Sequence, residues 1–534
     1  MIKSPRGTRD LLPPDTALWN FVEATVRDVF RVYNFHEIRT PIFESTELFA
    51  RGVGEETDIV SKEMFTWDDG NSPEMALQAS WAAQYQNKYD RIEPWVVGPD
   101  KRVPFFLGHR EGGWTIIKLK YYPDARDLRQ LEELATAEFD GPGDRKISKP
   151  TLAIAVPEEA IPSLRELAKD IEIQPVKIPD WFEPPRSLTL RPENTAGVVR
   201  AYIEHKLWDR GINKLFYIGP QFRRERPQKG RYRQFYQIGA EVIGPATAGS
   251  QSPARDAEIL ELLATLLDRV GITGWTLELN SVGCPADRAK FNEALRQALA
   301  PVVDKMCADC QRRAVTNPLR VFDCKVPEDQ PIIDTLPTIN QFLDDDCRLH
   351  YEAVKQILNA VEIPYVENPR LVRGLDYYTK TAFEFTHGSL GAQNAILGGG
   401  RYDGLSEALG GPPDPGIGFA IGEDRLVLSL TATAESVLRK PDVYVAPLGP
   451  GMDREAARVA RELRRHDLVV ELGDESFRKL KKSFEAADKL GARYILIVGE
   501  NEVAANTFAL KHLASGEQVT VPRAELSQRI MQKK

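Results

Sequence analysis

The sequence predicts an α+β protein of several domains, with antiparallel strands and helices along most of the chain and an α/β unit near the C-terminal end. Two observations carry this prediction. Alternating side chains at 216–225 and at 235–241 indicate two strands, and the basic, turn-rich loop between them makes an antiparallel hairpin. Beyond residue 440, three short apolar strands alternate with two helical segments, which is typical of an α/β unit.

The size and composition are those of a globular protein in water. A chain of 534 residues is long enough for three or four domains. Charged residues make up 28% and hydrophobic residues 42% of it, and no apolar run is long enough to cross a membrane. Residues 1–7 have no apolar signal core, so we expect a cytoplasmic protein. Because the net charge is -8, contacts with nucleic acid are expected only at local basic patches.

A helix and a proline-containing strand are predicted near the start of the chain. Apolar residues recur with helical spacing at 17–33, and residues 35–44 have the pattern of a strand. Pro41 lies inside this strand, and proline cannot donate a backbone hydrogen bond to a neighbouring strand. We therefore place the segment at a sheet edge or at a subunit interface. An edge strand in a monomer is the alternative.

The five cysteines are Cys284, Cys307, Cys310, Cys324 and Cys347. An odd number in an expected reducing compartment argues against a disulfide framework. Cys307-x-x-Cys310, with Cys284 and Cys324, offers four thiolates for zinc. A second C-x-x-C pair is missing from the sequence, however, and reduced thiols in a small helical module are the simpler reading. We therefore assign no metal ligand from the sequence.

The predicted hairpin gathers groups that suit a nucleotide. Arg223 and Glu225 point to one face of the first strand, because side chains alternate along a strand. Phe235, Gln237 and Glu241 share one face of the return strand. The rigid fork of arginine matches a phosphate group with two parallel hydrogen bonds. The patterns G-x-x-x-x-G-K-[ST] and G-x-G-x-x-G after a strand are both missing, so the phosphate-loop and Rossmann classes are not expected.

Two further segments carry a family resemblance. Residues 371–378 (LVRGLDYY) and the glycine cluster 398–404 (GGGRYDG) resemble the histidine-specific signatures of the histidyl-tRNA synthetases, a family of class II aminoacyl-tRNA synthetases. The hairpin resembles motif two of that class, and residues 415–426 resemble motif three. The resemblance implies an antiparallel catalytic sheet flanked by helices. It extends over about residues 1–70 and 187–525.

The resemblance implies an ATP site on the face of the hairpin. It places Arg223 at the α-phosphate, where charge develops during attack, as a catalytic residue. Glu225 is expected to accept from the adenine amino group and Phe235 to stack on the base. Arg231 is expected to reach the γ-phosphate, and Arg425 to cover the nucleotide from the other side. Mg²⁺ is expected with the phosphates.

The resemblance also implies a pocket for histidine. Glu193 and Thr195 match the loop that holds the α-ammonium group, and Glu241 and Tyr378 match the positions that meet the imidazole. Arg373 matches the histidine-specific arginine, a second expected catalytic residue that neutralises charge at the substrate carboxylate and the α-phosphate. The residues expected to bind histidine are Glu193, Thr195, Gln237, Glu241, Arg373, Tyr377 and Tyr378.

The resemblance further divides the chain. The expected segments are the catalytic domain in three parts (1–70 with the dimerisation motif, 187–280 with motif two, 351–430 with the histidine signatures and motif three), an inserted accessory domain (71–186), a helical insertion module (281–350), a linker (431–440) and an anticodon-binding domain (441–534). In the accessory domain we predict strands at 103–107, 114–119, 151–156 and 171–176 and helices at 125–136 and 158–169. Its role is left open.

These expectations add up to a homodimeric enzyme that activates histidine with ATP as histidyl-adenylate and transfers it to the 3′ end of tRNA(His). The alternative is the histidine-binding regulatory paralogue of ATP phosphoribosyltransferase, which shares the catalytic fold but does not charge tRNA. Such paralogues usually lack the C-terminal domain and lose the arginine and tyrosine signature, whereas this chain keeps both. The basic residues expected near tRNA are Arg312, Arg313 and Arg320 in the helical module and Arg478, Lys479, Lys481 and Lys482 near the C-terminus.

Overall fold

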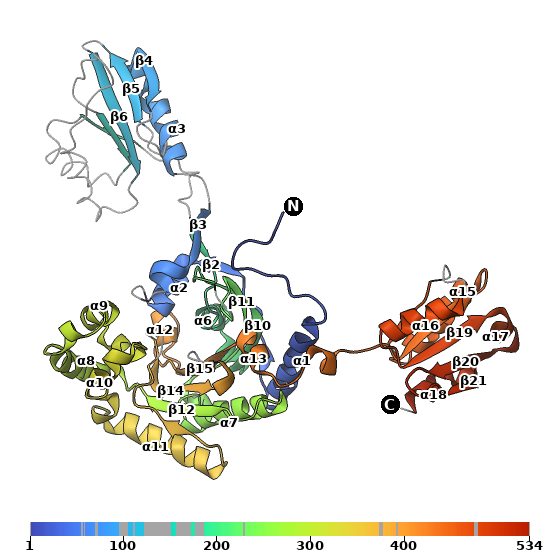
Figure 1. Ribbon diagram of the computed structural model, residues 1–534. Helices are drawn as coiled ribbons and strands as arrows, with labels where there is room; N and C mark the ends of the chain where they lie inside the picture. The colour runs from blue at the N-terminus through green and yellow to red at the C-terminus, as the bar shows by residue number, and fades with distance from the viewer. Residues whose placement is uncertain are drawn as a thin grey trace. The chain divides into compact units, whose positions relative to one another are not determined.

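The structure is a computed structural model, and Figure 1 follows its elements from α1 near the N-terminus to α18 near the C-terminus. It describes residues 2–54, 57, 59–69, 73–95, 105–110, 113–121, 151–155, 172–176, 186–227, 230–372, 377–390, 394–474 and 479–532. The chain divides into two compact units, which are residues 1–9, 30–265 and 274–428, and residues 10–29, 266–273 and 429–534. No helix among the described residues is long and apolar enough to cross a membrane.

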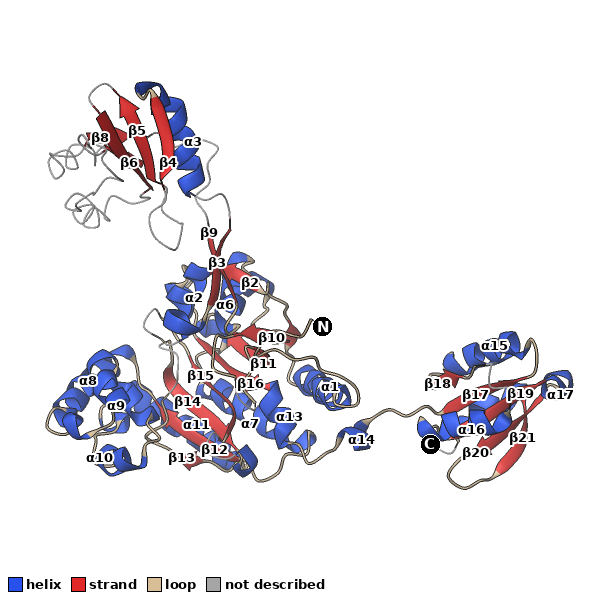
Figure 2. Ribbon diagram, turned by 45° about the horizontal axis from the view of Figure 1, so that its top comes forward, coloured by secondary structure: helices blue, strands red, loops and turns tan. Residues whose placement is uncertain are grey.

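An eight-stranded sheet forms the centre of the first unit (Figure 2). It is antiparallel except at its two edges, where β1 pairs in parallel with β10 and β13 with β12. In spatial order its strands are β1 (His36–Glu37), β10 (Lys214–Phe222), β11 (Gln234–Ile243), β16 (Gly416–Gly422), β15 (Ala395–Arg401), β14 (Thr379–Thr386), β12 (Thr276–Ser281) and β13 (Val366–Glu367). The predicted antiparallel sheet flanked by helices is confirmed.

One face of this sheet is apolar and buried. The ring of Phe30 lies 4.7 Å from that of Phe216 on β10 and 6.2 Å from that of Phe419 on β16, centroid to centroid. Ile238 and Ile421 lie directly opposite one another in the same layer and are fully buried. Besides the helical module, the helices that lie wholly or largely in the first unit are α2 (Thr46–Val53), α6 (Thr195–Glu204), α7 (Pro253–Arg269), α11 (Asp345–Ala360), α12 (Leu405–Ala408) and α13 (Glu423–Ser429), whereas α1 (Thr16–Val32) lies largely in the second. The opposite face carries Phe235, Gln237 and Glu241 of β11, which belong to the candidate active site.

The single strand predicted at 35–44 is wrong. The structure has β1, which pairs with β10, and a separate strand β2 (Phe43–Ser45), which pairs with β9 (Arg186–Leu190). Between them, the buried guanidinium group of Arg191 donates hydrogen bonds to the carbonyl oxygens of Thr40, at 3.0 Å, and Pro41, at 3.3 Å. Pro41 has no N–H to continue a ladder, so the chain changes partner strand there.

The chain between β3 (Phe65–Asp69) and β9 forms a separate sheet. Strands β3 and β9 themselves pair as an antiparallel hairpin, with Asp69 opposite Arg186. The order of the separate sheet is β4 (Arg91–Trp95), β5 (Phe105–Arg110), β6 (Gly113–Tyr121), β7 (Thr151–Ala155) and β8 (Glu172–Pro175). The parallel pairing of β7 with β8 is the one that a strand–helix–strand unit requires. The predicted helices 125–136 and 158–169 lie outside the described residues. Helix α3 (Pro73–Tyr85) and strand β4 were missed from the sequence.

A small helical module follows β12. Its elements are α8 (Pro285–Leu299), α9 (Ala308–Thr316), α10 (Gln330–Ile333) and the short helical turns η7 (Val303–Lys305), η8 (Pro318–Asp323), η9 (Pro327–Asp329) and η10 (Ile339–Gln341). Phe291, Leu295 and Val321 are at most 2% exposed and anchor its core. The hydrophobic core of this module is small, so a link between its segments, such as a bound metal ion, would contribute strongly to its stability.

The C-terminal unit contains a five-stranded sheet. Its strand order is β18 (Val470–Leu472), β17 (Val443–Leu448), β19 (Tyr494–Gly499), β20 (Thr507–His512) and β21 (Gln518–Pro522), with helices α15 (Met452–Arg464), α16 (Leu480–Lys489), α17 (Glu500–Ala505) and α18 (Leu526–Met531). The first three strands are parallel, as the predicted α/β unit requires. The antiparallel pair β20–β21 was not predicted. The predicted linker 431–440 contains the short helix α14 (Ala434–Val437).

Candidate active site

The site lies over a part of the sheet where glycine occupies neighbouring positions on three strands. We call this surface, which contains Gly239, Gly400 and Gly418, the glycine-paved face. Gly418 on β16 pairs with Glu241 on β11 on one side and with Gly400 on β15 on the other. A Cβ atom at Gly418 would overlap the Glu241 carboxylate, and one at Gly400 would lie 2.8 Å from the ring of Tyr378. A Cβ at Gly239 would overlap the ring of Tyr217. Because glycine has no Cβ atom, the side chains of Glu241, Tyr378 and Tyr217 can approach the backbone of the sheet closely at these positions.

The expected ATP residues line one open cavity of about 750 Å³. Arg223 follows β10 and is held in place, because its Nε donates to the carbonyl oxygen of Pro192 at 2.9 Å and its guanidinium carbon lies 5.3 Å from the centre of the Phe235 ring. Glu225 forms an ion pair with Arg231 at 3.2 Å. The structure thus brings together an aromatic platform, a carboxylate and two arginines, as the sequence predicted.

Arg425 lies in α13 and faces the same cavity, and its Nη1 donates to the carbonyl oxygen of Ala395 at 2.8 Å. Burial, and then the positive charge of Arg231, lower the pKa of Arg425 below its usual value. Two arginines that repel one another across a cavity are stabilised by an anion between them. This wall of the cavity therefore suits phosphate oxygens.

The N-terminal segment contacts residues of the same wall, which the sequence did not predict. Arg9 donates to the carboxylate of Asp424 at 2.5 Å, and its guanidinium carbon lies 4.3 Å from the centre of the Tyr232 ring. The N–H of Arg233 donates to the carbonyl oxygen of Gly7 at 2.7 Å. The segment is therefore tied to the loop that carries Arg231.

The histidine end of the face is centred on Glu241, which is fully buried. The hydroxyl groups of Thr195 and Tyr402 donate to its two carboxylate oxygens, each at 2.7 Å. Burial raises the pKa of Glu241 to about 8, although both hydrogen bonds lower it and the negative charge of Glu193 raises it further. A carboxyl group with this pKa is largely neutral at pH 7 and becomes ionised as the pH rises through about 8.

Glu193 is 5% exposed and lies at the start of α6. It accepts hydrogen bonds from the backbone N–H groups of Thr195, at 2.8 Å, and Ala196, at 3.0 Å. Burial raises its pKa, and the positive charge of Arg223 opposes this rise. A carboxylate at a helix N-terminus is favoured by the helix dipole, so Glu193 has a structural reason for its position besides any ligand.

Buried polar atoms on this face that have no hydrogen-bond partner among the described residues include Oε1 of Gln237 and the hydroxyl oxygen of Tyr217. Tyr377 and Tyr378 lie nearby, with ring centroids 4.7 Å apart, and Tyr377 also contacts Tyr402 at 5.8 Å. Buried polar groups normally find a partner, so unpaired ones at a site favour a polar ligand. Arg373 and Asp376 lie outside the described residues.

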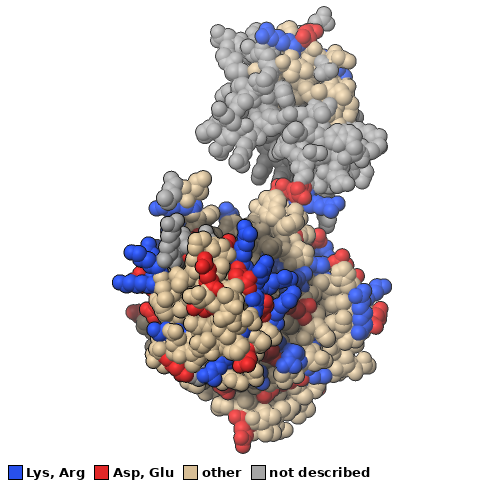
Figure 3. All heavy atoms as spheres, turned by 90° about the vertical axis from the view of Figure 1, so that its right-hand side faces the viewer, with Lys and Arg blue, Asp and Glu red and all other residues tan. Residues whose placement is uncertain are grey.

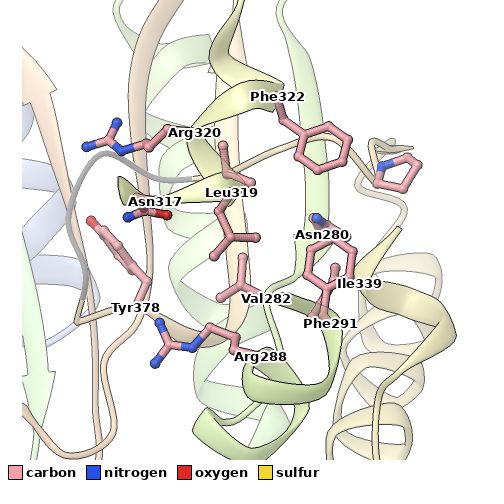
Figure 4. Close-up of a pocket in the computed structure, with 12 residues that line it drawn as sticks. Asn280, Val282, Arg288, Phe291, Asn317, Leu319, Arg320, Phe322, Ile339 and Tyr378 are labelled. Carbon is pink, nitrogen blue, oxygen red and sulfur yellow. The ribbon is translucent and has the colours of Figure 1, made fainter. Parts of the chain in front are cut away.

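A second pocket, of about 550 Å³, lies between the helical module and the edge of the sheet, and residues of both line it. Figure 4 shows the polar groups of Arg288, Asn317, Arg320 and Tyr378 gathered at one side of it. Phe291, Phe322 and Ile339 line the other side in the same view. Tyr378 thus lies between this pocket and the glycine-paved face, which places the helical module beside the histidine end of the site.

Three groups of the site were missed from the sequence: Tyr217, Tyr402 and Arg191. Tyr217 has the same strand parity as Arg223, so alternation along β10 was a usable signal. Tyr402 contacts Glu241 across 161 residues, and no local pattern indicates that pairing. Arg191 orders the loop before Glu193 through its bonds to residues 40, 41 and 220.

The three arginines of the helical module that were expected near tRNA are engaged within the chain. Arg312 pairs with Asp309 at 3.0 Å, Arg320 pairs with Asp323 at 2.9 Å, and Arg313 donates to the carbonyl oxygen of Arg320. Lys479, Lys481 and Lys482 are exposed at the start of α16, and Arg478 lies outside the described residues. Figure 3 shows basic and acidic side chains interspersed over the described part of one face.

The cysteines do not group as the sequence suggested. The thiols of Cys307, Cys310 and Cys324 come together with the carboxylate of Asp329. Cys284 is not part of this group and lies instead with Asp287, Asp344 and Cys347. The set of four thiols that the sequence left open as a zinc site, with Cys284 as its fourth member, is therefore not brought together, because Cys284 lies just before α8 and groups with residues near the start of α11.

The mainly antiparallel sheet, its arginine-lined open face and the separate C-terminal α/β unit define a class II aminoacyl-tRNA synthetase. Comparisons with known proteins give the family. The model of the histidyl-tRNA synthetase family matches residues 122–426, more than half of the chain, and the model of the anticodon binding domain matches residues 442–533. The chain belongs to the histidyl-tRNA synthetase family.

Individual relatives agree with this assignment. The chain is 57% identical to a histidine–tRNA ligase of Koribacter versatilis, over 99% of this chain and 95% of the relative, and 46% identical to one of Solibacter usitatus, over 99% of both. Among solved structures, the apo histidyl-tRNA synthetase of S. aureus matches with a TM-score of 0.63 at 31% identity, over 99% of this chain and 100% of that chain.

Proposed function

We propose that this chain charges tRNA(His), joining histidine to ATP as histidyl-adenylate and then passing it to the 3′ end of the tRNA. The proposal rests on one observation: the same face of the sheet has arginine side chains that suit phosphate at one end and the buried carboxyl group of Glu241 at the other. Gln237 lines the cavity beside Phe235, and Glu241 lies further along the same face of β11. Phe235 and Glu241 are six residues apart, about 20 Å along a strand. That separation fits an adenine at one end and an imidazole at the other.

In this proposal the reaction takes place between the two ends. One carboxylate oxygen of histidine attacks the α-phosphorus of ATP, the bond to the β-phosphate oxygen breaks, and pyrophosphate leaves. Arg223 is already oriented by Pro192 and Phe235, so it stabilises the developing charge without reorganising. Arg373 is proposed to act from the histidine side. The tRNA hydroxyl then attacks the carbonyl carbon, and AMP leaves.

Mg²⁺ is proposed to accompany the phosphates. The cavity wall also contains the carboxylate of Glu384, and carboxylate oxygens are ligands that Mg²⁺ prefers. When bound, the ion would neutralise part of the phosphate charge. The arginines of the site carry the remaining charge, with Arg231 and Arg425 at the outer wall.

The partners and location follow as proposals. The match to an anticodon binding domain supports tRNA as the partner of residues 441–534. A homodimer is supported by exposed apolar side chains near the proposed interface segment, because Ile42, Phe43 and Trp67 are 46%, 53% and 39% exposed. We also propose a cytoplasmic enzyme. A regulatory paralogue is less well supported, since the relative titled as a regulatory subunit or synthetase, from Bacillus halodurans, is 17% identical and indicates the fold alone.

Replacing Glu241 with alanine should lower kcat/KM for histidine in ATP–pyrophosphate exchange by roughly 10- to 150-fold, about 1.5–3 kcal/mol. The reason is that the pocket loses its acceptor for the imidazole. The KM for ATP should barely change. Glu241→Gln keeps the volume but cannot ionise. For the wild type, kcat/KM should rise with pH as Glu241, with its pKa raised to about 8, becomes ionised, and this rise should be lost in the glutamine variant.

Thermal melting of both variants is the control for the Glu241 experiment. Glu241 bonds Thr195 and Tyr402, so a purely structural role would lower the melting temperature and weaken histidine and ATP use equally. That outcome would remove Glu241 from histidine recognition. A charging assay with tRNA(His) completes the test, because a chain that binds histidine but neither exchanges nor charges would contradict the proposed function itself.

The inserted sheet is proposed to be an accessory domain outside the catalytic site. Asp69 and Arg186 lie opposite one another in the β3–β9 hairpin, so a short Asn-Gly turn can replace everything between them. The shortened protein should fold and retain histidine-dependent exchange. A shortened protein that is soluble and dimeric but wholly inactive in exchange would place the insertion within the active site.

A further inference from the structure

Three cysteines and one aspartate meet inside the helical module. Cys307 precedes α9, Cys310 lies in its first turn, Cys324 follows η8, and Asp329 ends η9. One ligand atom from each residue lies within 4.8 Å of all the others. We propose that these four residues bind one zinc ion as a closed structural site.

The distances are those of a tetrahedral zinc site. With a Zn–S bond of about 2.3 Å, two thiolates on a tetrahedral ion are about 3.8 Å apart. The sulfur atoms of Cys307 and Cys324 are 3.9 Å apart, and the sulfur of Cys324 lies 3.2 Å from Oδ2 of Asp329. Three thiolates and one carboxylate complete the usual four ligands. No position is left for water, so the site is structural and not catalytic.

Backbone donors support the charged form of two of the ligands. The N–H of Val326 donates to the sulfur of Cys324 at 3.4 Å, two residues along the chain. The N–H of Cys307 donates to both oxygens of Asp329, at 3.1 and 3.2 Å. Bonds of this kind orient metal ligands and raise metal affinity. Cys310 is fully buried and Asp329 is 2% exposed, so a bound ion would be shielded from competing water.

The second group of the module is different. Cys284, Asp287, Asp344 and Cys347 also lie within 4.8 Å of one another, but they include two thiols instead of three. Asp287 accepts from the backbone N–H of Cys284 and of Asp344, and Asp344 accepts from the N–H of Cys347 at 2.7 Å. The two carboxylates serve the starts of α8 and α11, and with one thiol fewer this group is a weaker match to zinc, which prefers thiolate ligands in structural sites. This group provides a matched control.

The proposed ion would tie together parts of the module that lie up to 22 residues apart in the chain, the separation of Cys307 and Asp329. A metal that binds only the folded form contributes its binding free energy to folding, which matters most for a compact core. Cys324 and Lys325 also line a large cavity together with Arg231 and Arg425. The ion would therefore fix one wall beside the nucleotide end of the site.

The experiment measures zinc in the full-length protein. After chelator treatment under reducing conditions and dialysis, the protein is titrated with ZnCl₂ and the bound metal is counted by atomic spectroscopy. We expect one zinc per chain for the wild type and for Cys347→Ser. Cys307→Ser, at a partly exposed position, should lose most of the metal. Asp329→Cys should keep it, and with Co²⁺ its thiolate-to-cobalt charge-transfer bands should strengthen as a fourth sulfur replaces oxygen.

A stability measurement uses the same variants. Chelator should lower the melting temperature of the wild type and of Cys347→Ser, and should leave Cys307→Ser unchanged. A wild-type chain that takes up no zinc, although all five thiols react with a thiol reagent after unfolding and are therefore reduced, would overturn the proposal. An equal loss of metal in Cys347→Ser and Cys307→Ser would overturn it as well. These readouts count metal and melting, so they are independent of the proposed charging of tRNA.

Discussion

Replacing Arg223 with alanine is expected to slow adenylate formation by about 10²–10³-fold, the usual loss when one preorganised donor to a developing charge is removed. The Arg223 side chain is fixed before substrate arrives, by its bond to the carbonyl oxygen of Pro192 and by the ring of Phe235. The loss should therefore appear mainly in kcat of single-turnover activation, with a smaller change in the KM for ATP.

Arg224→Ala is the matched control for this substitution. Arg224 is the next residue, but it is exposed, and its guanidinium carbon lies 5.4 Å from the centre of the Phe65 ring. Both substitutions remove one positive charge from the same loop, so general electrostatics would affect them alike. An Arg223→Ala enzyme that activates histidine within about threefold of wild type, roughly 0.65 kcal/mol, would remove this residue from the mechanism.

Arg401→Met is expected to lower the free energy of unfolding of the catalytic part by about 3–5 kcal/mol, the usual loss when one member of a buried ion pair is removed. Arg401 and Asp256 are both fully buried and form a short ion pair. Arg401 also donates to Asp403 at 3.0 Å and to the carbonyl oxygen of Ser250 at 2.9 Å. The substitution would leave Asp256 with hydrogen bonds to His350 and Thr381 but without its guanidinium partner.

The pH dependence of the pair gives a further readout. Burial alone would raise the pKa of Asp256, but the positive charge of Arg401 and its hydrogen bonds bring it below the usual value. An acid with a lowered pKa stabilises the fold above its unfolded pKa and loses this contribution as the pH falls. Urea unfolding at neutral and acidic pH should therefore separate the wild type from Arg401→Met most clearly at neutral pH.

Arg348→Met serves as the control for Arg401, because its partner Asp345 is 83% exposed and surface pairs contribute about 0–1 kcal/mol. An unfolding transition of Arg401→Met that coincides with that of Arg348→Met would show that the buried pair contributes little. The double variant with Asp256→Asn should recover part of the loss, since it removes the uncompensated charge.

Local sequence patterns predicted the parts of the site that lie along one element. Phe235, Gln237 and Glu241 share a face because β11 is a strand, and alternation along a strand is a local property. The contact of Tyr402 with Glu241 depends on how β15 and β16 pair with β11, which spacing does not specify. The cysteines make the same point, because spacing alone could not choose between Cys284 and Asp329 as the fourth member of the group.

The proline at position 41 marks another limit of sequence patterns. It was correctly identified as unable to continue a ladder, but alternation alone suggested one strand from 35 to 44. The break is made by Arg191, which lies 150 residues away and occupies the carbonyl groups of residues 40 and 41. Long-range side-chain bonds of this kind decide where a strand ends, and they leave no trace in local periodicity.

The glycine-paved face has a consequence for the genetics of this enzyme. Gly239, Gly400 and Gly418 carry no functional group, yet a single added methyl group at any of them would collide with Tyr217, Tyr378 or Glu241. No residue is smaller than glycine, so every missense change in these codons adds atoms to a full space. Missense alleles with little or no activity should therefore arise at these three glycines as often as at the charged residues of the site.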